Sequence, residues 1–377
     1  MENFLDLKET STGREDSTIL PKARMEWVSP DLLRILRCPL CKGSLSLSKE
    51  KLCCAPCAKT YPVVLGIPDL RIYEDPLIPL EDDYRKGEKV QGQAENLRFA
   101  DLVRYYWSLP TYPYTPPELR ERFIHHVLTD EARIAGYRDK IGSGKAFLDV
   151  GCGTAALVKV AQPKFDFAVG CDVAFRWLLI GRKRLQEAEL PANLVCCCAD
   201  YLPFSNQTFD SVASVSLLEH VSDAPAAIHE FARVAQPDAR IFVWTTNRFS
   251  LAPEPHVRVW GVGFLPRRWM PAYVKWRSGL PYEKKHLLSC FEIRRFFSRE
   301  GLDHINFSLP GITAPDWENL RGVERLAARI FRLAAVTPLL KSCLILVSPV
   351  IQVLARRKRA AGGRAETESL KAAATAK

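Results

Sequence analysis

The residues best suited to chemistry lie between positions 147 and 200, where three apolar runs each end at or beside an aspartate, Asp149, Asp172 and Asp200. Gly151 and Gly153 follow the first aspartate, and glycines let a backbone turn sharply and approach a ligand closely. A helical pattern comes next, and its first backbone N–H groups would point at that ligand. A carboxylate at this turn repels a pyrophosphate but attracts a cation. The turn therefore favours a cofactor with an ammonium and a sulfonium, which describes S-adenosylmethionine (SAM), over NAD.

The three aspartates have the spacing of a cofactor crevice. Asp172 follows Gly153 by about 20 residues, the separation at which an acid can bind both hydroxyls of a ribose. A fourth apolar run, 209–216, follows Asp200. Because parallel strands all end at the same edge of a sheet, we expect the three carboxylates to face one crevice. An ordinary α/β core in which the acids stand by chance is the competing interpretation.

Taken together, these segments resemble the class I SAM-dependent methyltransferases of the type 11 kind. The matching residues are 149–153, 170–173, 199–204, 209–210 and 217–221, and the resemblance covers about 115–356. It implies that SAM is the cofactor. By position it also implies the cofactor-binding residues: Asp149 near the ammonium, Gly151, Cys152 and Gly153 around the methionine moiety, Asp172 and Val173 at the ribose, Asp200 and Tyr201 at the adenine, and Ser216 and Leu217 beside the methyl donor.

The pair Glu219-His220 looks like that of the ubiquinone-biosynthesis and related small-molecule methyltransferases. This resemblance implies methylation of O or C on a small or lipid-like acceptor. His220 is the predicted general base, because imidazole titrates near neutral pH and would stand beside the transferred methyl; a packing role is the alternative. His256 is the second predicted catalytic residue, and His286 and Glu219 are further candidates. Methyl transfer can also rest on alignment alone, without a dedicated base.

The elements that must position these residues follow from the hydrophobic periodicity. Strand and helix patterns alternate, which predicts an α/β fold: a Rossmann-like parallel sheet with helices on both faces. We expect helices near 117–140, 154–161, 174–188, 224–235 and 289–300. We expect strands near 146–150, 167–172, 194–199, 209–216 and 239–245, with a last pair near 304–309 and 350–356.

Residues 246–288 interrupt this alternation, where a connection of a few residues would suffice, and we interpret them as a substrate lid. Basic and aromatic side chains alternate in this segment, and the net charge of the chain is +10. Such a surface also suits base stacking beside phosphates, so an rRNA or tRNA methyltransferase is the second hypothesis. Against it, the sequence has no Asn-Pro-Pro-Tyr-type motif. A non-enzymatic scaffold is the third hypothesis, and the intact set of aspartates argues against it.

Two Cys-x-x-Cys pairs near the N-terminus, Cys38 with Cys41 and Cys54 with Cys57, have the spacing of zinc knuckles. A β-hairpin over 42–53 could join the two turns, and Cys53 is a competing ligand. Four thiolates leave no open coordination position, so a Zn²⁺ ion here would be structural. Residues 33–70 are also similar to the small zinc-ribbon proteins that activate tRNA and rRNA methyltransferases. That resemblance rests on Leu36, the four cysteines, and residues 61–63 and 66–70.

The chain divides into predicted units: a disordered arm at 1–30, the zinc ribbon at 31–72, a linker at 73–115, the methyltransferase domain at 116–358 and a disordered tail at 359–377. The first residues lack the apolar segment of a secretory signal. We therefore expect a cytoplasmic protein whose cysteines are metal ligands or core residues, not disulfides.

The apolar segment 333–355 is followed by four basic residues, 356–359. Pro338, Lys341 and Pro349 interrupt it, and no uninterrupted part reaches the roughly 20 residues of a membrane span. We expect a buried helix followed by the final strand. Peripheral contact with the inner face of a membrane is the alternative.

Overall fold

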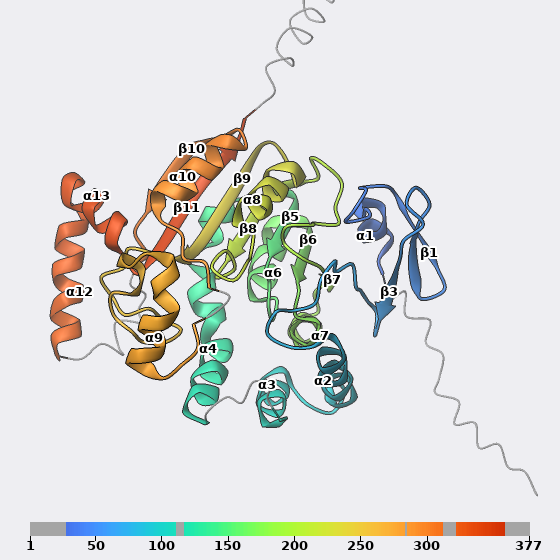
Figure 1. Ribbon diagram of the computed structural model, residues 1–377. Coiled ribbons are helices and arrows are strands. Elements are labelled where there is room, and N and C mark those ends of the chain that lie inside the picture. The colour runs from blue at the N-terminus through green and yellow to red at the C-terminus, as the bar shows by residue number, and fades with distance from the viewer. Residues whose placement is uncertain (1–27, 111–116, 283–284, 312–321, 359–377) are drawn as a thin grey trace, which may run out of the picture.

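The structure is a computed structural model that describes residues 28–110, 117–282, 285–311 and 322–358 (Figure 1). Most of the predicted arm, the last residues of the predicted linker and the whole predicted tail lie outside the described residues. Two units stand out along the chain, a small N-terminal β unit and a large α/β unit (Figure 1).

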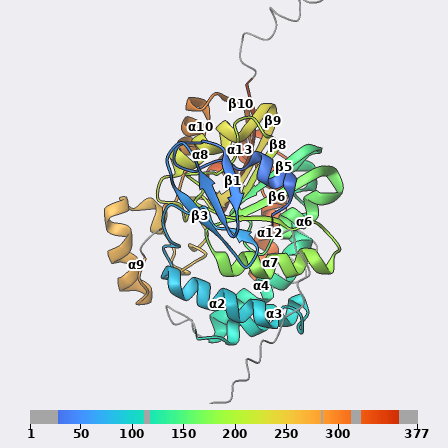
Figure 2. The ribbon, with the colours of Figure 1, turned by 90° about the vertical axis from the view of Figure 1, so that its right-hand side faces the viewer.

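The N-terminal unit is the predicted ribbon. Helix α1 (Pro30–Ile35) begins where the Ser29 side chain accepts a hydrogen bond from the Leu32 backbone. Four short strands follow, β1 (Leu45–Ser48), β2 (Lys51–Cys54), β3 (Thr60–Val64) and β4 (Ile67–Pro68), and they form one antiparallel sheet in chain order. The expected hairpin is β1–β2. Figure 2 shows the ribbon in front of one end of the larger unit.

The segment predicted as a linker is folded onto the larger unit. It forms α2 (Leu80–Gln93) and α3 (Phe99–Ser108), which pack against α7 (Phe175–Glu187). The predicted helix at 117–140 is divided at Gly136 into α4 (Pro117–Ala135) and α5 (Arg138–Ile141). The apolar side chains of this region belong to the same buried cluster as one face of the main sheet.

The main sheet confirms the predicted α/β class. Its strands are β5 (Gly144–Val150), β6 (Phe165–Asp172), β7 (Asn193–Cys196), β8 (Phe209–Val215), β9 (Ala235–Thr246), β10 (Leu302–Ser308) and β11 (Val350–Arg357). They lie in the order β10-β11-β9-β8-β5-β6-β7, where β5 to β9 are parallel and β11 is antiparallel to both neighbours. The chain changes direction across the sheet between β5 and β8, and cofactors bind such sheets at that point.

Helices cover both faces of the sheet. α6 (Ala156–Ala161), the turn η1 (Gln162–Lys164) and α7 lie on one face, and α8 (Ala224–Val234) and α10 (Cys290–Arg299) lie on the other. Each face has its own buried apolar cluster. Adjacent side chains of β5 point to opposite faces: Phe147 belongs to the first cluster, on the side of α6 and α7, and Leu148 to the second, on the side of α8 and α10. The second cluster also contains the core of the ribbon, so the two units share apolar packing.

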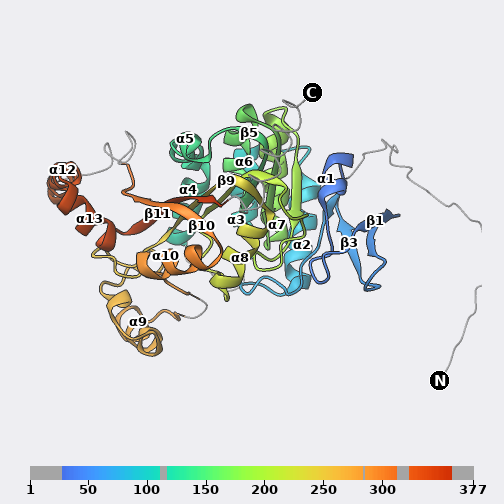
Figure 3. The ribbon, with the colours of Figure 1, turned by 90° about the horizontal axis from the view of Figure 1, so that it is seen from above.

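The insertion and the C-terminal helices lie at the end opposite the ribbon (Figures 1 and 3). The insertion contains η2 (Val262–Phe264), η3 (Arg267–Trp269) and α9 (Met270–Ser278), and has a small core of its own. α12 (Gly322–Ala335) and α13 (Pro338–Val347) precede β11. The expected buried helix is wrong, since α13 has no buried residue: it packs against α12, and Ile345 near its end is only partly buried against the sheet cluster. No helix of the described parts is long and apolar enough to cross a membrane.

Candidate functional site

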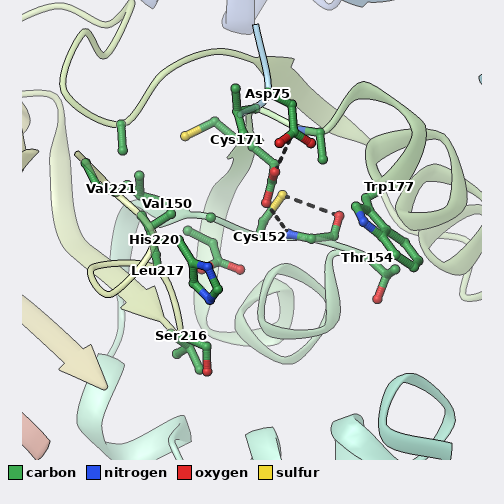
Figure 4. Close-up of a pocket in the computed structure, with 18 of the residues that line it drawn as sticks. Asp75, Val150, Cys152, Thr154, Cys171, Trp177, Ser216, Leu217, His220 and Val221 are labelled. Atoms are coloured by element: carbon green, nitrogen blue, oxygen red, sulfur yellow. Dashed lines mark hydrogen bonds between the residues drawn. The ribbon is translucent and has the colours of Figure 1, made fainter. Parts of the chain in front are cut away.

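A cavity of about 380 Å³ lies at the carboxyl ends of β5, β6 and β8 (Figure 4). It stands at the point where the strand order reverses. The sequence predicted a crevice at the carboxyl ends of the strands, which is where this cavity lies. Most of its walls come from segments that the motifs identified. The lining includes residues 149–154, 171–174, 197–199 and 215–217, together with 220–222, residues 73 and 75–77 and one side of α4.

The glycine turn forms the floor of the cavity. Gly151 and Gly153 have φ of 78° and 49°, which L-residues rarely adopt. A Cβ atom on Gly151 would lie 2.9 Å from the Cβ of Leu217, so a side chain has no room there. Cys152, between the glycines, is buried and lines the cavity. The helix after this turn begins at Ala156, and its first two residues line the cavity together with the turn.

Asp149 is a buried acid without a partner. Its side chain is 2% exposed, and its Oδ1 has no hydrogen-bond partner among the described residues. Burial, and then the nearby carboxylate of Asp172, raise the pKa of Asp149 to about 8. A buried carboxyl that lacks a donor is a costly arrangement unless a ligand completes it. A cationic group fits this position, because it would both pair with the carboxylate and lower its pKa.

Asp172 is held in place by the backbone. Its Oδ2 accepts a hydrogen bond from Gly153 N at 2.9 Å, and its Oδ1 accepts one from Ala174 N at 2.8 Å. Burial raises its pKa, and these two hydrogen bonds oppose that shift. The carboxylate is therefore fixed between the glycine turn and α7, where a diol could bind. Val173 lines the cavity beside it.

The structure separates Asp200 and Tyr201 from the other predicted residues. Neither belongs to the cavity lining, which takes Cys197, Cys198 and Ala199 from this stretch because β7 ends early, at Cys196. Instead, the Tyr73 hydroxyl donates a hydrogen bond of 2.5 Å to Asp200 Oδ1. Ser216 and Leu217, by contrast, line the cavity as expected.

Sequence reasoning missed the wall contributed by residues 73–77. Asp75 lines the cavity and accepts a hydrogen bond from Arg176 Nη1 at 2.8 Å. Arg176 is also a buried lining residue, and it donates to Asp83 Oδ1 at 2.9 Å and to the Tyr106 hydroxyl at 3.0 Å. The aspartates and tyrosines of the predicted linker were the available signal, but a charged stretch usually indicates a solvated segment.

At the edge of the cavity, the insertion brings two polar side chains to His220. Lys285 Nζ lies 2.7 Å from His220 Nδ1, and the ring of His256 meets the ring of His220 edge-on at 5.0 Å. Burial, and then the positive charge of Lys285 and the proximity of His256, lower the pKa of His220 to about 3. His220 is therefore neutral. Because Lys285 donates to Nδ1, the ring proton belongs on Nε2.

His256 is oriented by a buried acid. Its Nδ1 lies 2.6 Å from Glu254 Oε1, and Glu254 Oε2 accepts the backbone N–H groups of His256 and Val257 at 2.9 Å each. Glu254 is only 4% exposed. With the proton of His256 on Nδ1, its Nε2 carries a lone pair. Sequence reasoning found His256 but missed Glu254, although the two are only two residues apart.

Glu219, the other candidate of this group, is hydrogen-bonded to the end of β9 through its side chain and to the insertion through its backbone. Its oxygens accept hydrogen bonds from the Thr245 and Thr246 hydroxyls at 2.6 and 3.1 Å, and it is 1% exposed. Its backbone carbonyl also accepts from His286 N at 2.8 Å. Both carboxylate oxygens are thus occupied by the end of β9, which favours a role in holding the insertion.

The four predicted zinc ligands come together in the ribbon. The Sγ atoms of Cys38, Cys41, Cys54 and Cys57 lie within 4.8 Å of one another, with Cys38–Cys57 at 3.6 Å and Cys41–Cys54 at 3.4 Å. Tetrahedral Zn²⁺ with Zn–S bonds of about 2.3 Å needs S–S distances of about 3.8 Å, so the thiols fit such an ion. Cys53 is not part of the cluster.

The sheet order, the glycine turn and the two cavity acids resemble those of the class I SAM-dependent methyltransferases. The comparisons support this class, since residues 148–243 match the family model described as a methyltransferase domain. The chain is similar to the ubiquinone biosynthesis O-methyltransferase of Coxiella burnetii, with 26% identity over 163 residues, 43% of this chain and 65% of the relative. It is also similar to the enzyme of that name from Thiobacillus denitrificans, with 28% identity over 156 residues, 41% of this chain and 63% of the relative.

The chain thus spans just under two thirds of the length of these relatives. Among solved structures, it is similar to phosphoethanolamine N-methyltransferase 2 of Haemonchus contortus in complex with SAM. The identity is 16%, the match covers 61% of this chain and 52% of that chain, and the TM-score is 0.41. This likeness is too weak to add to the fold that the strand order defines.

Proposed function

We propose that the protein transfers a methyl group from SAM to a hydroxyl oxygen of a small or lipid-like acceptor. The observation that carries the proposal is the buried carboxyl of Asp149, whose Oδ1 has no hydrogen-bond partner among the described residues, beside a glycine turn in which Gly151 leaves no room for a side chain. The relatives support the acceptor class, because those named above are O-methyltransferases of ubiquinone biosynthesis. They give no support to the RNA hypothesis, and the complete cavity argues against an inactive scaffold.

The cofactor would be held by residues with separate tasks. Asp149 would pair with its ammonium, Gly151 and Gly153 would admit its methionine moiety, and Asp172 would bind its ribose. Tyr73 stands between the cavity and Asp200, so we propose that Tyr73 fixes Asp200 for the adenine rather than leaving it free. When bound, SAM supplies a methyl group on a positively charged sulfur, which makes that carbon electrophilic.

We further propose that His256 is the general base. An acceptor hydroxyl would give its proton to Nε2 of His256, while Nδ1–H stays hydrogen-bonded to Glu254 and the positive charge that forms is stabilised by that carboxylate. The acceptor oxygen would then form its bond to the methyl carbon as the bond from carbon to sulfur breaks. His220 would donate its Nε2–H to the acceptor oxygen and so orient it.

The insertion 246–288 would act as the wall over the acceptor, because it supplies Glu254, His256 and Lys285 to the side of the cavity where Ser216 and Leu217 lie. The cysteine cluster would hold a structural Zn²⁺ ion, since four thiolates leave no position for a substrate.

Turnover of methyl-labelled SAM with fractionated cell extract tests the reaction. We expect label in the lipid or small-molecule fraction and none in the RNA fraction. Asp149→Asn should abolish labelling, whereas Asp166→Asn, on the exposed start of β6, should not. Label that RNase releases would overturn the acceptor class, and full labelling by Asp149→Asn would overturn the cofactor site.

A further inference from the structure

The α12–α13 pair exposes an apolar surface that nothing in the described chain covers. Ala328 is buried on α12, but most large apolar side chains of the pair face outward. The exposed set is Leu326 (58%), Ile330 (58%), Leu333 (70%), Val336 (80%), Leu339 (74%), Leu340 (48%) and Leu346 (38%). A contiguous group of this kind on a folded protein marks a binding surface.

The same two helices carry basic side chains and almost no acids. Arg325, Arg329 and Arg332 recur every three or four residues along α12, and Lys341 lies on α13. All four are exposed. Glu324 is the one acid in the sequence of residues 322–358. The pair is therefore an apolar surface with a positive border.

The insertion adds exposed aromatic side chains at the same end of the molecule (Figures 1 and 3). Trp260, Trp269 and Trp276 are 60%, 54% and 76% exposed. Two contacts join the insertion to the pair: Leu251 N donates to Val347 O at 3.0 Å, and Asn247 Nδ2 donates to Leu346 O at 2.9 Å. The end of α13 thus joins the insertion to the helix pair, so that both exposed surfaces lie at the same end of the protein.

We propose that this end of the protein, formed by α12, α13 and the exposed tryptophans of the insertion, docks on the surface of an anionic lipid bilayer. Leucine and valine would enter the boundary between headgroups and acyl chains, tryptophan would lie at the headgroup level, and the arginines would meet lipid phosphates. Because no described helix could cross a bilayer, the protein would lie on the surface. The proposal does not depend on the methyl-transfer reaction.

The chemistry of the surface favours lipid over two other occupants. In a symmetric dimer the same patch faces itself, so the arginines and Lys341 of one copy would meet those of the other. RNA would pair with the arginines and stack on the tryptophans, but it would leave the exposed leucine, isoleucine and valine side chains of the α12–α13 pair in water. A bilayer with anionic headgroups satisfies both the charge and the apolar area.

Vesicle flotation of the full chain tests this inference. The probes are phosphatidylcholine vesicles with and without phosphatidylglycerol. We expect the protein to float with the anionic vesicles, and added salt to weaken binding. Leu333→Glu combined with Val336→Glu should reduce the bound fraction about tenfold or more, because two charges would enter the apolar boundary. Leu47→Glu, which alters an exposed leucine on the ribbon, is the matched control and should float like the wild type.

Charge reversal of Arg329 and Arg332 to Glu provides a second variant that leaves the apolar side chains intact. It should remove the preference for anionic vesicles. Circular dichroism and SAM binding check that each variant is folded. The proposal is overturned if the wild type does not float with anionic vesicles. It is equally overturned if ultracentrifugation shows a dimer that Leu333→Glu with Val336→Glu dissociates while vesicle binding is unchanged.

Discussion

At the scale of single residues, the site depends on the protonation state of Asp149. Burial disfavours the ionised carboxylate in the free protein, whereas the proposed cationic ligand requires it. The carboxyl is buried, Asp172 lies nearby, and its pKa is raised to about 8. In the free protein at neutral pH it is therefore mainly protonated. A cation at this position would reverse the balance, because pairing favours the ionised form.

This predicts a pH-dependent affinity for SAM. Binding must remove the proton from Asp149, so below about pH 8 the apparent Kd should weaken by up to about tenfold per pH unit, and above it the Kd should level off. Calorimetry in buffers of different ionisation enthalpy would report the released proton. Asp149→Asn should bind weakly at every pH and show no such slope. A wild-type Kd that is constant between about pH 6 and pH 9 would contradict the assignment.

The two histidines beside the cavity should differ in kinetics. Loss of a general base typically costs about 10²–10⁴ in rate, and we expect this range for His256→Gln. His220 stays neutral because its pKa is about 3. His220→Asn should therefore change KM or kcat but keep the shape of the pH profile. His304→Gln is the control, since that side chain is 78% exposed. A His256→Gln enzyme with an unchanged kcat would contradict the general-base role, and catalysis would then rest on the alignment of the reacting atoms.

At the scale of elements, the segment between β4 and α2 ties the ribbon to the cavity. Arg71 is buried between Asp69 and Asp83, with its Nη1 2.7 Å from Asp83 Oδ2 and 3.0 Å from Val173 O. Asp83 also accepts the backbone N–H groups of Phe175 and Arg176, at the start of α7. One fully buried carboxylate thus organises two arginines and the first turn of a helix.

Asp83→Asn should destabilise the fold strongly. Removing one partner of a buried ionic network leaves the two arginines undercompensated, and such changes cost about 3–5 kcal/mol. Chemical unfolding would measure the loss. The matched variant Asp82→Asn removes a carboxylate that pairs with Arg85 on the accessible side of the same turn, and should cost about 0.5 kcal/mol or less. Equal effects of the two variants would show that the network does not stabilise the protein.

The elements that the sequence predicts well are those in which buried apolar residues recur at a regular spacing or form a continuous run. All seven strands of the main sheet lie where alternating or continuous apolar runs indicated them. Asp172 is the last residue of β6, and Asp149 is the last but one of β5. The run Glu81-Asp82-Asp83 gives no signal that only its last acid is buried, because that depends on Arg71 and Arg176 far along the chain. The apolar residues of the insertion recur with no regular period. Its fold, and with it the position of Glu254 and Lys285 near the cavity, is therefore not predictable from the sequence. For α13, an apolar composition indicated burial, but composition does not fix which side of a helix finds a partner.

At the scale of the whole molecule, the ribbon closes an edge of the main sheet. β7 is the outermost strand, and Cys196 O accepts a hydrogen bond of 2.8 Å from Leu70 N. Farther along, Arg37 N donates to Pro203 O at 2.8 Å, and Lys42 pairs with Glu230 at 2.8 Å. An uncovered edge strand is prone to pair with other chains, so the ribbon protects the sheet as well as holding the wall of the cavity.

Removal of the proposed Zn²⁺ ion should therefore affect the SAM site. Metal binding by four cysteines would contribute to the folding free energy of the ribbon, so without the ion the chain from Leu70 to Leu77 would lose its anchor, together with the Tyr73 and Asp75 walls of the cavity. We expect Cys41→Ser to lower the metal content, the melting temperature and the affinity for SAM together. Cys53→Ser, next to the cluster but outside it, should change none of the three. If the ribbon instead melted alone while SAM bound as tightly as before, the ribbon would be an attached unit and not part of the site.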